Sequence, residues 1–313
     1  MTGRFIISLD CEGHWGMADK PRVARSYVTH EALMHAYEAL LALFEEFEMA
    51  ATFAFVGMFT LTNVERDRFA PQLGDLPYRG ESWLKHYHAE MAAGQEDGWF
   101  CPEAFEAVRA APQHEIASHG FSHIPFDGPD TPPEVLRHEF EMAQAIAKTK
   151  GVDMETFIFS RNQIGALAAL GETGFTGYRA ALGSSGGRFG APALRLAREM
   201  YVLDRAQPDV LVASDGMVTI PPGYFLNWRH GIRGMIPPAL IVARWRHILR
   251  SAARHGQVAH IWTHPHNFIS APQTLDMFRN ILAQAAQLQL PRVAQLGSCS
   301  CKPKPPMCRP SDN

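Results

Sequence analysis

The chain has 313 residues, of which 46% are hydrophobic and 19% are charged, and its formal net charge is −3. This composition supports a sizeable core and excludes a chain that is disordered over most of its length. The weak negative charge argues against a partner such as nucleic acid, whose phosphates require a basic surface. Charged residues or histidines interrupt every apolar run, so we expect no membrane span.

Strand and helix signals alternate along residues 1–290, which predicts a single α/β domain with a largely parallel sheet. Strands are expected at residues 4–9, 51–57, 114–118, 156–160, 175–180, 216–221 and 257–263. Helices are expected at residues 32–49, 101–112, 131–151, 163–174, 239–255 and 272–289, with Thr131 as an N-cap and Gly151 as a stop signal. About seven β/α units favour a distorted (β/α)7-type barrel, because no Gly-x-Gly-x-x-Gly follows the first strand to indicate an open doubly wound sheet.

The first strand ends in three groups that bind metals or transfer protons, namely Asp10, Glu12 and His14. Side chains two apart at a strand end can point to the same side, so one carboxylate can bind a metal while the other accepts a proton. His14 competes with Glu12 as a metal ligand and is otherwise expected to be a solvated loop residue. Trp15 is either a platform for a sugar ring or a packed anchor of the loop.

The third strand is followed by His119 and His123, which are four residues apart. Side chains at this spacing lie together on a helical turn or a similar loop. Two imidazoles and one carboxylate form a ligand set that leaves a coordination position open for water. This chain has 15 histidines, so the spacing alone is weak evidence for a metal site, and a histidine pair that binds no metal is the alternative.

The fourth strand ends in Arg161, for which Asp10 is the expected ion-pair partner and a rim salt bridge is the alternative. The last strand ends in His264, whose pKa near neutrality suits a general acid that protonates a departing amine. His266 competes for that role, and Pro265 is expected to point the two rings apart.

Residues 183–190 are expected to form an irregular loop, and residues 291–313 an irregular Pro- and Cys-containing tail. Three of the five cysteines lie in this tail, and an odd number of cysteines is not a disulfide framework. The N-terminus lacks the apolar stretch of a secretory signal, so we expect a cytoplasmic protein.

Taken in order, "LDCEG", "SHGFSH", "FSRNQ" and "IWTHPH" resemble the motifs of the NodB-homology polysaccharide deacetylases, carbohydrate esterase family four. The similarity runs over about residues 4–290. It implies a distorted barrel of about seven units. It also implies that Asp10 is the catalytic base, that His119 and His123 bind a metal, that Arg161 orients the base and that His264 is the general acid.

Two positions depart from the family pattern. Cys11 separates Asp10 from the next carboxylate, so that Glu12 stands in for a ligand aspartate, and Asn162 follows the arginine where proline is usual. Glu12 is therefore expected to be the third metal ligand. The aspartate that usually supports the acidic histidine has two candidates here, Asp204 and Asp215.

The resemblance implies a metal-dependent hydrolase that removes N-acetyl groups from an acetamido sugar in a polysaccharide or glycan precursor. Zn2+ is the expected metal, with Co2+, Ni2+ and Mn2+ as alternatives; it would activate water and polarise the acetyl carbonyl. Without an export signal, a lipid- or nucleotide-linked precursor is the favoured substrate. The alternatives are a related C–N hydrolase of a small amide or ureide, and a non-catalytic carbohydrate-binding barrel.

Overall fold

The computed structural model describes residues 3–74, 77–78, 80–126, 131–181, 206–208, 211–212, 216–226, 229 and 234–290. The expected loop at 183–190, the tail at 291–313 and both candidate partners of His264, Asp204 and Asp215, lie outside the described residues.

The described strands form a nine-stranded sheet in the order β10-β11-β1-β2-β5-β6-β7-β9-β8. Every neighbouring pair is parallel except β8 with β9, which is antiparallel. The strands are β1 (Arg4–Cys11), β2 (Thr52–Phe55), β5 (Glu115–Ser118), β6 (Thr156–Phe157), β7 (Gly177–Arg179), β8 (Leu211–Val212), β9 (Val218–Ile220), β10 (Tyr224–Phe225) and β11 (Val258–Thr263). A small hairpin joins β3 (Pro77–Tyr78) and β4 (Glu81–Ser82).

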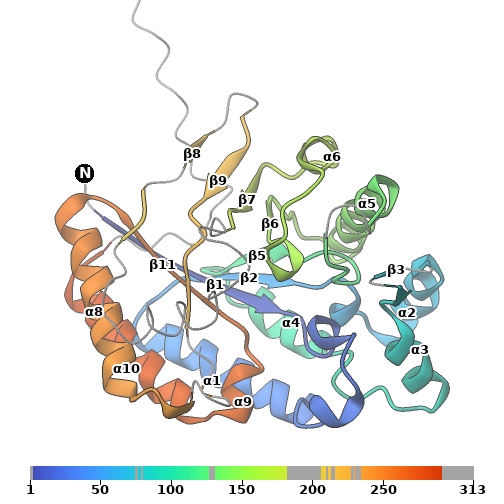
Figure 1. Ribbon diagram of the computed structural model, residues 1–313, viewed down its shortest axis with the longest axis horizontal. Helices are drawn as coiled ribbons and strands as arrows, with labels where there is room; N and C mark the ends of the chain where they lie inside the picture. Colours follow the sequence, from blue (N-terminus) through green and yellow to red (C-terminus); the bar gives the residue numbers. More distant parts are fainter. Residues whose placement is uncertain are drawn as a thin grey trace, which may run out of the picture.

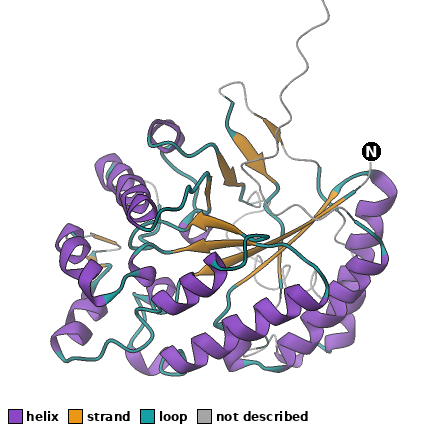
Figure 2. Cartoon of the chain, turned by 180° about the vertical axis from the view of Figure 1, so that it is seen from behind, coloured by secondary structure: helices purple, strands orange, loops and turns teal. Residues whose placement is uncertain are grey.

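Helices surround the sheet, which curls into a half-barrel (Figures 1 and 2). They are α1 (His30–Glu46), α2 (Asn63–Phe69), α3 (Lys85–Ala92), α4 (Pro102–Arg109), α5 (Pro133–Thr149), α6 (Leu167–Glu172), α8 (Pro238–His255), α9 (Asn267–Ser270) and α10 (Gln273–Gln287). Parallel strands with covering helices are the architecture of a distorted (β/α)7-type barrel, so the predicted fold class is confirmed. In the part of the chain that the structure describes, no helix has the length and apolar character that crossing a membrane requires.

The expected N-cap of α5 is wrong. Pro132 occupies that position, and the Thr131 hydroxyl instead donates to the carbonyl of Pro125 at 2.9 Å. Two consecutive prolines explain the shift, because proline fits the first helical turn, where its missing N–H has no intrahelical acceptor. Gly151, with a φ of +66°, follows the helix end as expected.

The barrel closes irregularly. The two outer strands of the sheet, β10 and β8, are not neighbours in the described ladder. Instead, Gln207 forms a single antiparallel bridge with Val258, the first residue of β11. The N–H of each residue donates to the carbonyl of the other, at 2.7 and 2.9 Å. Among the described residues, the segment leading towards β8 therefore contacts the other side of the sheet through this single bridge rather than through a full strand pair.

Candidate active site

The strand register brings the polar strand ends together. Leu9 pairs with Thr263, so His264 follows β11 at the level of Asp10 on β1. Cys11 pairs with Phe55 and Phe55 pairs with Ser118, so Glu12 and His119 both lie one residue beyond the same row of the sheet. Parallel strands place their carboxyl ends at one edge, which is why segments more than 100 residues apart meet there.

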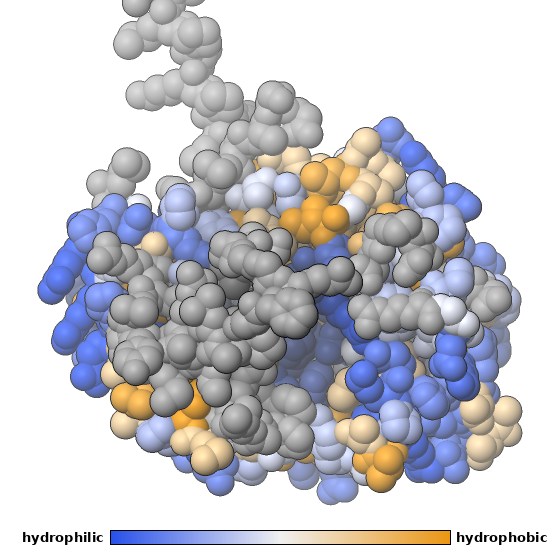
Figure 3. All heavy atoms as spheres, viewed as in Figure 1, coloured by the Kyte–Doolittle hydropathy of each residue, from blue (hydrophilic) through white to orange (hydrophobic). Residues whose placement is uncertain are grey.

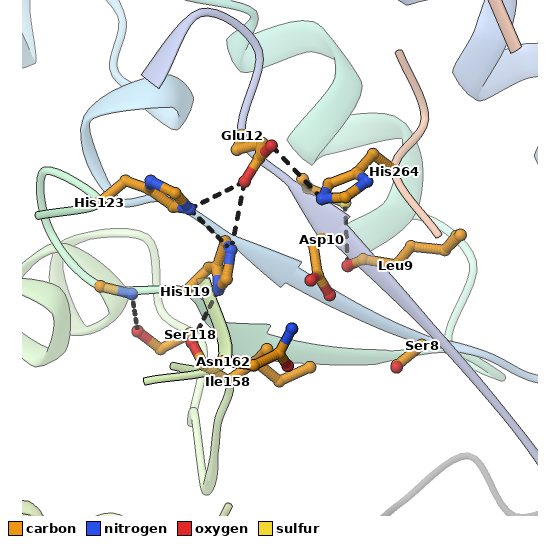
Figure 4. Close-up of polar contacts among 12 residues, drawn as sticks. Ser8, Leu9, Asp10, Glu12, Ser118, His119, His123, Ile158, Asn162 and His264 are labelled. Carbon is orange, nitrogen blue, oxygen red and sulfur yellow. Dashed lines mark hydrogen bonds and ion pairs between the residues drawn. The ribbon is translucent and has the colours of Figure 1, made fainter. Parts of the chain in front are cut away.

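Three potential metal-ligand atoms converge at this edge (Figure 4). Oε2 of Glu12 lies 2.8 Å from Nε2 of His123 and 3.3 Å from Nε2 of His119, and the two imidazole nitrogens are 3.1 Å apart. Ligands at tetrahedral zinc, each about 2.0–2.1 Å from the ion, lie roughly 3.3 Å from one another. The spacing of Glu12, His119 and His123 thus fits a small divalent cation.

The backbone around this triad holds it in place. Nδ1 of His119 lies 2.7 Å from the carbonyl of Ile158, which sets the proton on Nδ1 and leaves Nε2 free to bind a metal. Gly16 gives the Glu12 carboxylate its room, because a Cβ at this position would lie 2.0 Å from Oε1 of Glu12. His123 has a φ of +61°, a strained conformation of the kind that gathers at functional sites.

The charges within the triad shift its pKa values. Burial favours the neutral carboxyl of Glu12, but the positive potential of His264 and His123 outweighs it and holds the pKa well below the usual range. Burial also opposes protonation of His119, but the Glu12 carboxylate outweighs it and raises the pKa. Burial lowers the pKa of His123. An ionised carboxylate with a neutral imidazole beside it is a donor set that binds zinc.

The loop between the two histidines rests on Glu139 of α5. One carboxylate oxygen accepts the N–H groups of Phe121 and Ser122, each at 2.9 Å, and the other accepts the Ser122 hydroxyl. Glu139 is buried, and burial raises its pKa. These contacts fix the loop conformation that turns His119 and His123 towards each other.

Asp10 is paired with Arg179, at the end of β7, and not with Arg161. The two guanidinium nitrogens lie 2.8 and 2.7 Å from the two carboxylate oxygens, and both side chains are almost fully buried, at 1% and 3% exposure. Burial opposes ionisation of Asp10, but the charge of Arg179 outweighs it and lowers the pKa. Asp10 therefore remains a carboxylate of fixed orientation.

Arg179 is itself held by polar groups from other strands. One of its nitrogens donates to the Ser8 hydroxyl at 3.0 Å, and another donates to the Asn162 side-chain oxygen at 3.0 Å. Ser8 in turn lies 2.9 Å from Nε2 of His260, whose Nδ1 donates to the carbonyl of Pro221 at 2.6 Å. Burial lowers the pKa of His260 to about 3, so this ring is a neutral support of the arginine.

Arg161 reaches the rim of the site instead. It donates to Asp19 at 2.7 Å and to the Tyr78 hydroxyl at 3.2 Å, and it stacks over Trp83 at 4.9 Å. Its φ of +54°, followed by +56° at Asn162, turns the chain away from Asp10 just after β6. The expected ion pair with Asp10 is thus wrong because of this turn, and the alternative of a rim salt bridge is what the structure contains.

His264 and His266 lie side by side rather than apart. Their ring centroids are 5.0 Å apart and the rings are inclined by 26°, so the expected effect of Pro265 is wrong. His264 is 21% exposed, and its Nε2 lies 3.5 Å from Oε1 of Glu12. Its Nδ1 lies 3.2 Å from the side-chain amide of Asn267. Burial, with the nearby His264, lowers the pKa of His266 to about 3.

His14 points away from the triad and is buried, so the expected solvated loop residue is also wrong. Its Nδ1 accepts from Arg25 at 2.9 Å and its Nε2 donates to the carbonyl of Arg25 at 3.0 Å, which leaves no nitrogen for a metal. Burial lowers the pKa of His14 to about 4. Trp15 is fully buried and donates to the carbonyl of Trp99 at 2.7 Å, as expected of a loop anchor.

The metal-ligand triad, Asp10 and His264 line a cavity of about 300 Å³. Figure 3, in the same view as Figure 1, shows a recessed hydrophilic region near the place where β1 ends. The lining residues include Asp10, Glu12, His119, His123, Arg161, Asn162, His264, His266 and Asn267, with the aromatic rings of Phe225 and Trp262. Such a cavity combines a polar floor with an aromatic wall, as small-ligand sites do.

Arg179 and Glu139 are among the residues of the site that the sequence analysis did not predict. Arg179 ends a predicted strand, and an arginine at the end of a buried strand is a signal of a carboxylate partner, as for Arg161. Glu139 left no comparable signal, because a glutamate on an amphipathic helix normally faces solvent.

The polysaccharide deacetylase family model matches residues 20–176 of this chain. The match covers half of the chain. The chain belongs to this family. The matched range contains His119, His123 and Arg161 of this polysaccharide deacetylase homologue, whereas Asp10, Glu12, Arg179 and His264 lie outside it.

Solved structures share the fold. A Mycobacterium smegmatis protein assigned as a polysaccharide deacetylase is 17% identical, with a TM-score of 0.60 over 95% of this chain and 90% of that one. A Pseudomonas aeruginosa PAO1 protein with the same assignment is 13% identical, with a TM-score of 0.53 over 94% and 90%. A 4-alpha-glucanotransferase of Thermococcus litoralis has a TM-score of 0.50 at 13% identity, over 95% of this chain and 40% of that chain. A comparison with curated protein sequences finds no significant match.

Proposed function

We propose that this deacetylase is metal-dependent and removes the acetyl group from an acetamido sugar. The observation that carries the proposal is the convergence of Glu12, His119 and His123 on one point, with the Arg179-bound carboxylate of Asp10 in the same cavity. Membership in the family supports the reaction class.

Glu12, His119 and His123 would hold the cation, and Zn2+ fits this set of one oxygen and two imidazole nitrogens. The bound ion supplies a Lewis acid that lowers the pKa of water and polarises the acetyl carbonyl. The imidazole of His119 is oriented for this role, because its Nδ1 proton is directed to the carbonyl of Ile158, which leaves Nε2 towards the ion.

Asp10 would act as the general base. It is the second carboxylate in the cavity, and Arg179 occupies both of its oxygens without removing their remaining lone pairs. Since Arg179 keeps this carboxylate ionised, Asp10 can accept the proton of a water molecule that attacks the acetyl carbon.

His264 would act as the general acid. It lies on the opposite side of Glu12 from His119 and His123, and it is partly exposed to the cavity (Figure 4). With its Nδ1 near the Asn267 amide, Nε2 is the nitrogen that faces the site and can protonate the departing amine. Arg161, at the rim, would contact the substrate rather than orient the base.

The aromatic wall supports a sugar substrate. Phe225 and Trp262 pack against each other at 4.7 Å and both line the cavity beside His264. Flat aromatic faces pack against the apolar faces of sugar rings, and a cavity of about 300 Å³ matches a small ligand group rather than a long buried polymer segment. The cytoplasmic location and the glycan-precursor substrate stay predictions.

The test is acetate release from N-acetylated sugars and oligosaccharides by zinc-loaded protein. We expect Asp10→Asn and His119→Ala to lower kcat/KM at least 100-fold, because each removes a group that acts on the reacting atoms. His247→Ala, which changes an exposed histidine of α8, should not alter the rate. Folded variants that release acetate as fast as the wild type would refute the mechanism. Release of ammonia from amides or ureides without acetate release from sugars would favour the alternative hydrolase.

A further inference from the structure

Glu12 has histidines on both sides of its carboxylate. The cation proposed above would bind only the two histidines on one side, His119 and His123. Oε2 points to His119 and His123, whereas Oε1 lies 3.5 Å from Nε2 of His264 (Figure 4). Oε1 is therefore available to bind a second ion on the side of His264.

His266 completes a second cluster on that side. One ring nitrogen each of His264 and His266 and one Glu12 oxygen lie within 4.8 Å of one another. His266 is only 6% exposed, and its Nδ1 is buried without a hydrogen-bond partner among the described residues. A buried polar atom without a partner is costly, and it marks a place where an ion or water is expected to bind.

We propose that Glu12, His264 and His266 form a second divalent-cation site, joined to the first by a bridging Glu12 carboxylate. Imidazole and carboxylate are ligands that zinc accepts, and paired ions in two-metal sites are about 3.5–4 Å apart. A carboxylate that gives one oxygen to each ion spans such a distance. The Asn267 amide supports the site, because a half-turn of this amide lets its oxygen accept the Nδ1 proton of His264.

The second site has a consequence for catalysis that rests on the proposed function. A cation bound to Nε2 of His264 occupies the lone pair that would otherwise carry the transferred proton. His264 then cannot protonate a departing amine. The second cation therefore inhibits the deacetylase, while the first is required.

The binding test needs no substrate. Metal-free protein is titrated with Zn2+ at pH 7.5, and the ions retained per chain are counted by calorimetry and by elemental analysis. We expect two ions in the wild type and one in both His266→Gln and His264→Gln, with the weaker binding step lost. His247→Ala, a surface histidine control, should retain two. Thermal unfolding identifies a variant that does not fold. If one of the two glutamine variants fails to fold, the ion count of the other tests the proposal.

One ion per chain in the wild type, or two in both folded variants, would overturn the proposal. Acetate release provides an independent readout. Wild-type activity should rise with the first equivalent of zinc and fall at least tenfold as the second binds, and His266→Gln should lose the falling phase. A falling phase that persists in His266→Gln would overturn the inhibitory role. If zinc binds twice but no acetate is released from any sugar, the proposed function fails and the second site stands.

Discussion

At the scale of single residues, the contrast between the two arginines near the site is informative. Arg179 and Asp10 are almost fully buried, whereas the side chains of Arg161 and Asp19 are 27% and 23% exposed. A buried charge that loses its partner is destabilising, whereas an exposed pair is screened by water. Replacing each of the two arginines should therefore affect the stability and the activity of the protein differently.

Replacing Arg179 by Ala should lower the free energy of unfolding by about 3–5 kcal/mol, because the Asp10 carboxylate would remain buried without its partner. Arg161→Ala should cost about 1 kcal/mol or less. Urea denaturation of the metal-free proteins measures both values. Equal losses in the two variants would contradict the assignment of Arg179 as the partner of Asp10.

Asp10 should also make stability depend on pH. Its folded pKa is lowered below the unfolded value of about 3.9, so its contribution is present above that value and is lost as the pH falls through the folded pKa. In metal-free protein, the wild type should therefore lose more stability than Asp10→Asn between pH 6 and pH 3, and the two curves should converge at low pH. Parallel curves would show that folding does not lower the pKa of Asp10.

At the scale of elements, the turn after β6 decides which arginine reaches the base. Arg161 and Asn162 both have positive φ, and the Asn162 side chain accepts from Arg179 at 3.0 Å. Proline, which the family usually has at the second position, is fixed near a φ of −65° and cannot adopt this turn. In this chain the arginine that contacts Asp10 is therefore Arg179, at the end of β7, and not Arg161.

Asn162→Pro should destabilise the protein by about 3 kcal/mol or more, because it forces a different φ and removes the N–H that donates to Phe159. Asn162→Gly keeps the backbone conformation and should cost about 1 kcal/mol, mainly through the lost contact with Arg179. Thermal unfolding of both variants provides the comparison. A proline variant as stable as the glycine variant would show that the turn is not required.

The elements themselves were largely predictable. The sequence predicts strands at residues 4–9 and 257–263, and these segments form β1 and β11. Short apolar runs that end at glycine or polar residues are typical of buried strands. The short strands β8 and β10, with two residues each, gave no periodic signal. The helix start at Pro133 rather than Thr131 shows how local proline chemistry overrides a polar cap candidate.

At the scale of the whole molecule, the site is assembled from distant segments, so a bound ion should stabilise the fold. Glu12 follows β1, whereas His119 and His123 follow β5, more than 100 residues later. A ligand that binds the folded state and not the unfolded chain stabilises by about 2.7 kcal/mol at a concentration 100 times Kd. A cation bound at the proposed site would therefore link folding to occupancy of the site.

Removal of divalent metal by a chelator should abolish acetate release and lower Tm by roughly 5 °C or more relative to zinc-saturated protein. Added Zn2+ should restore both. His123→Ala provides the control, since its Tm should respond much less to the chelator or to added zinc. A wild-type Tm that is the same with and without zinc would argue against a metal at this site.

The sequence by itself determined the fold class and the strand ends that carry Asp10, Glu12, His119, His123 and His264, because strand periodicity and motif order are local properties of the chain. The tertiary structure decided which of these groups touch. In the structure, Arg179 rather than Arg161 contacts Asp10, and His14 is buried against Arg25. His266 lies beside His264 rather than apart from it. The reason is physical: contacts between strand ends depend on backbone turns and on burial, and neither is encoded in the spacing of residues along a single segment.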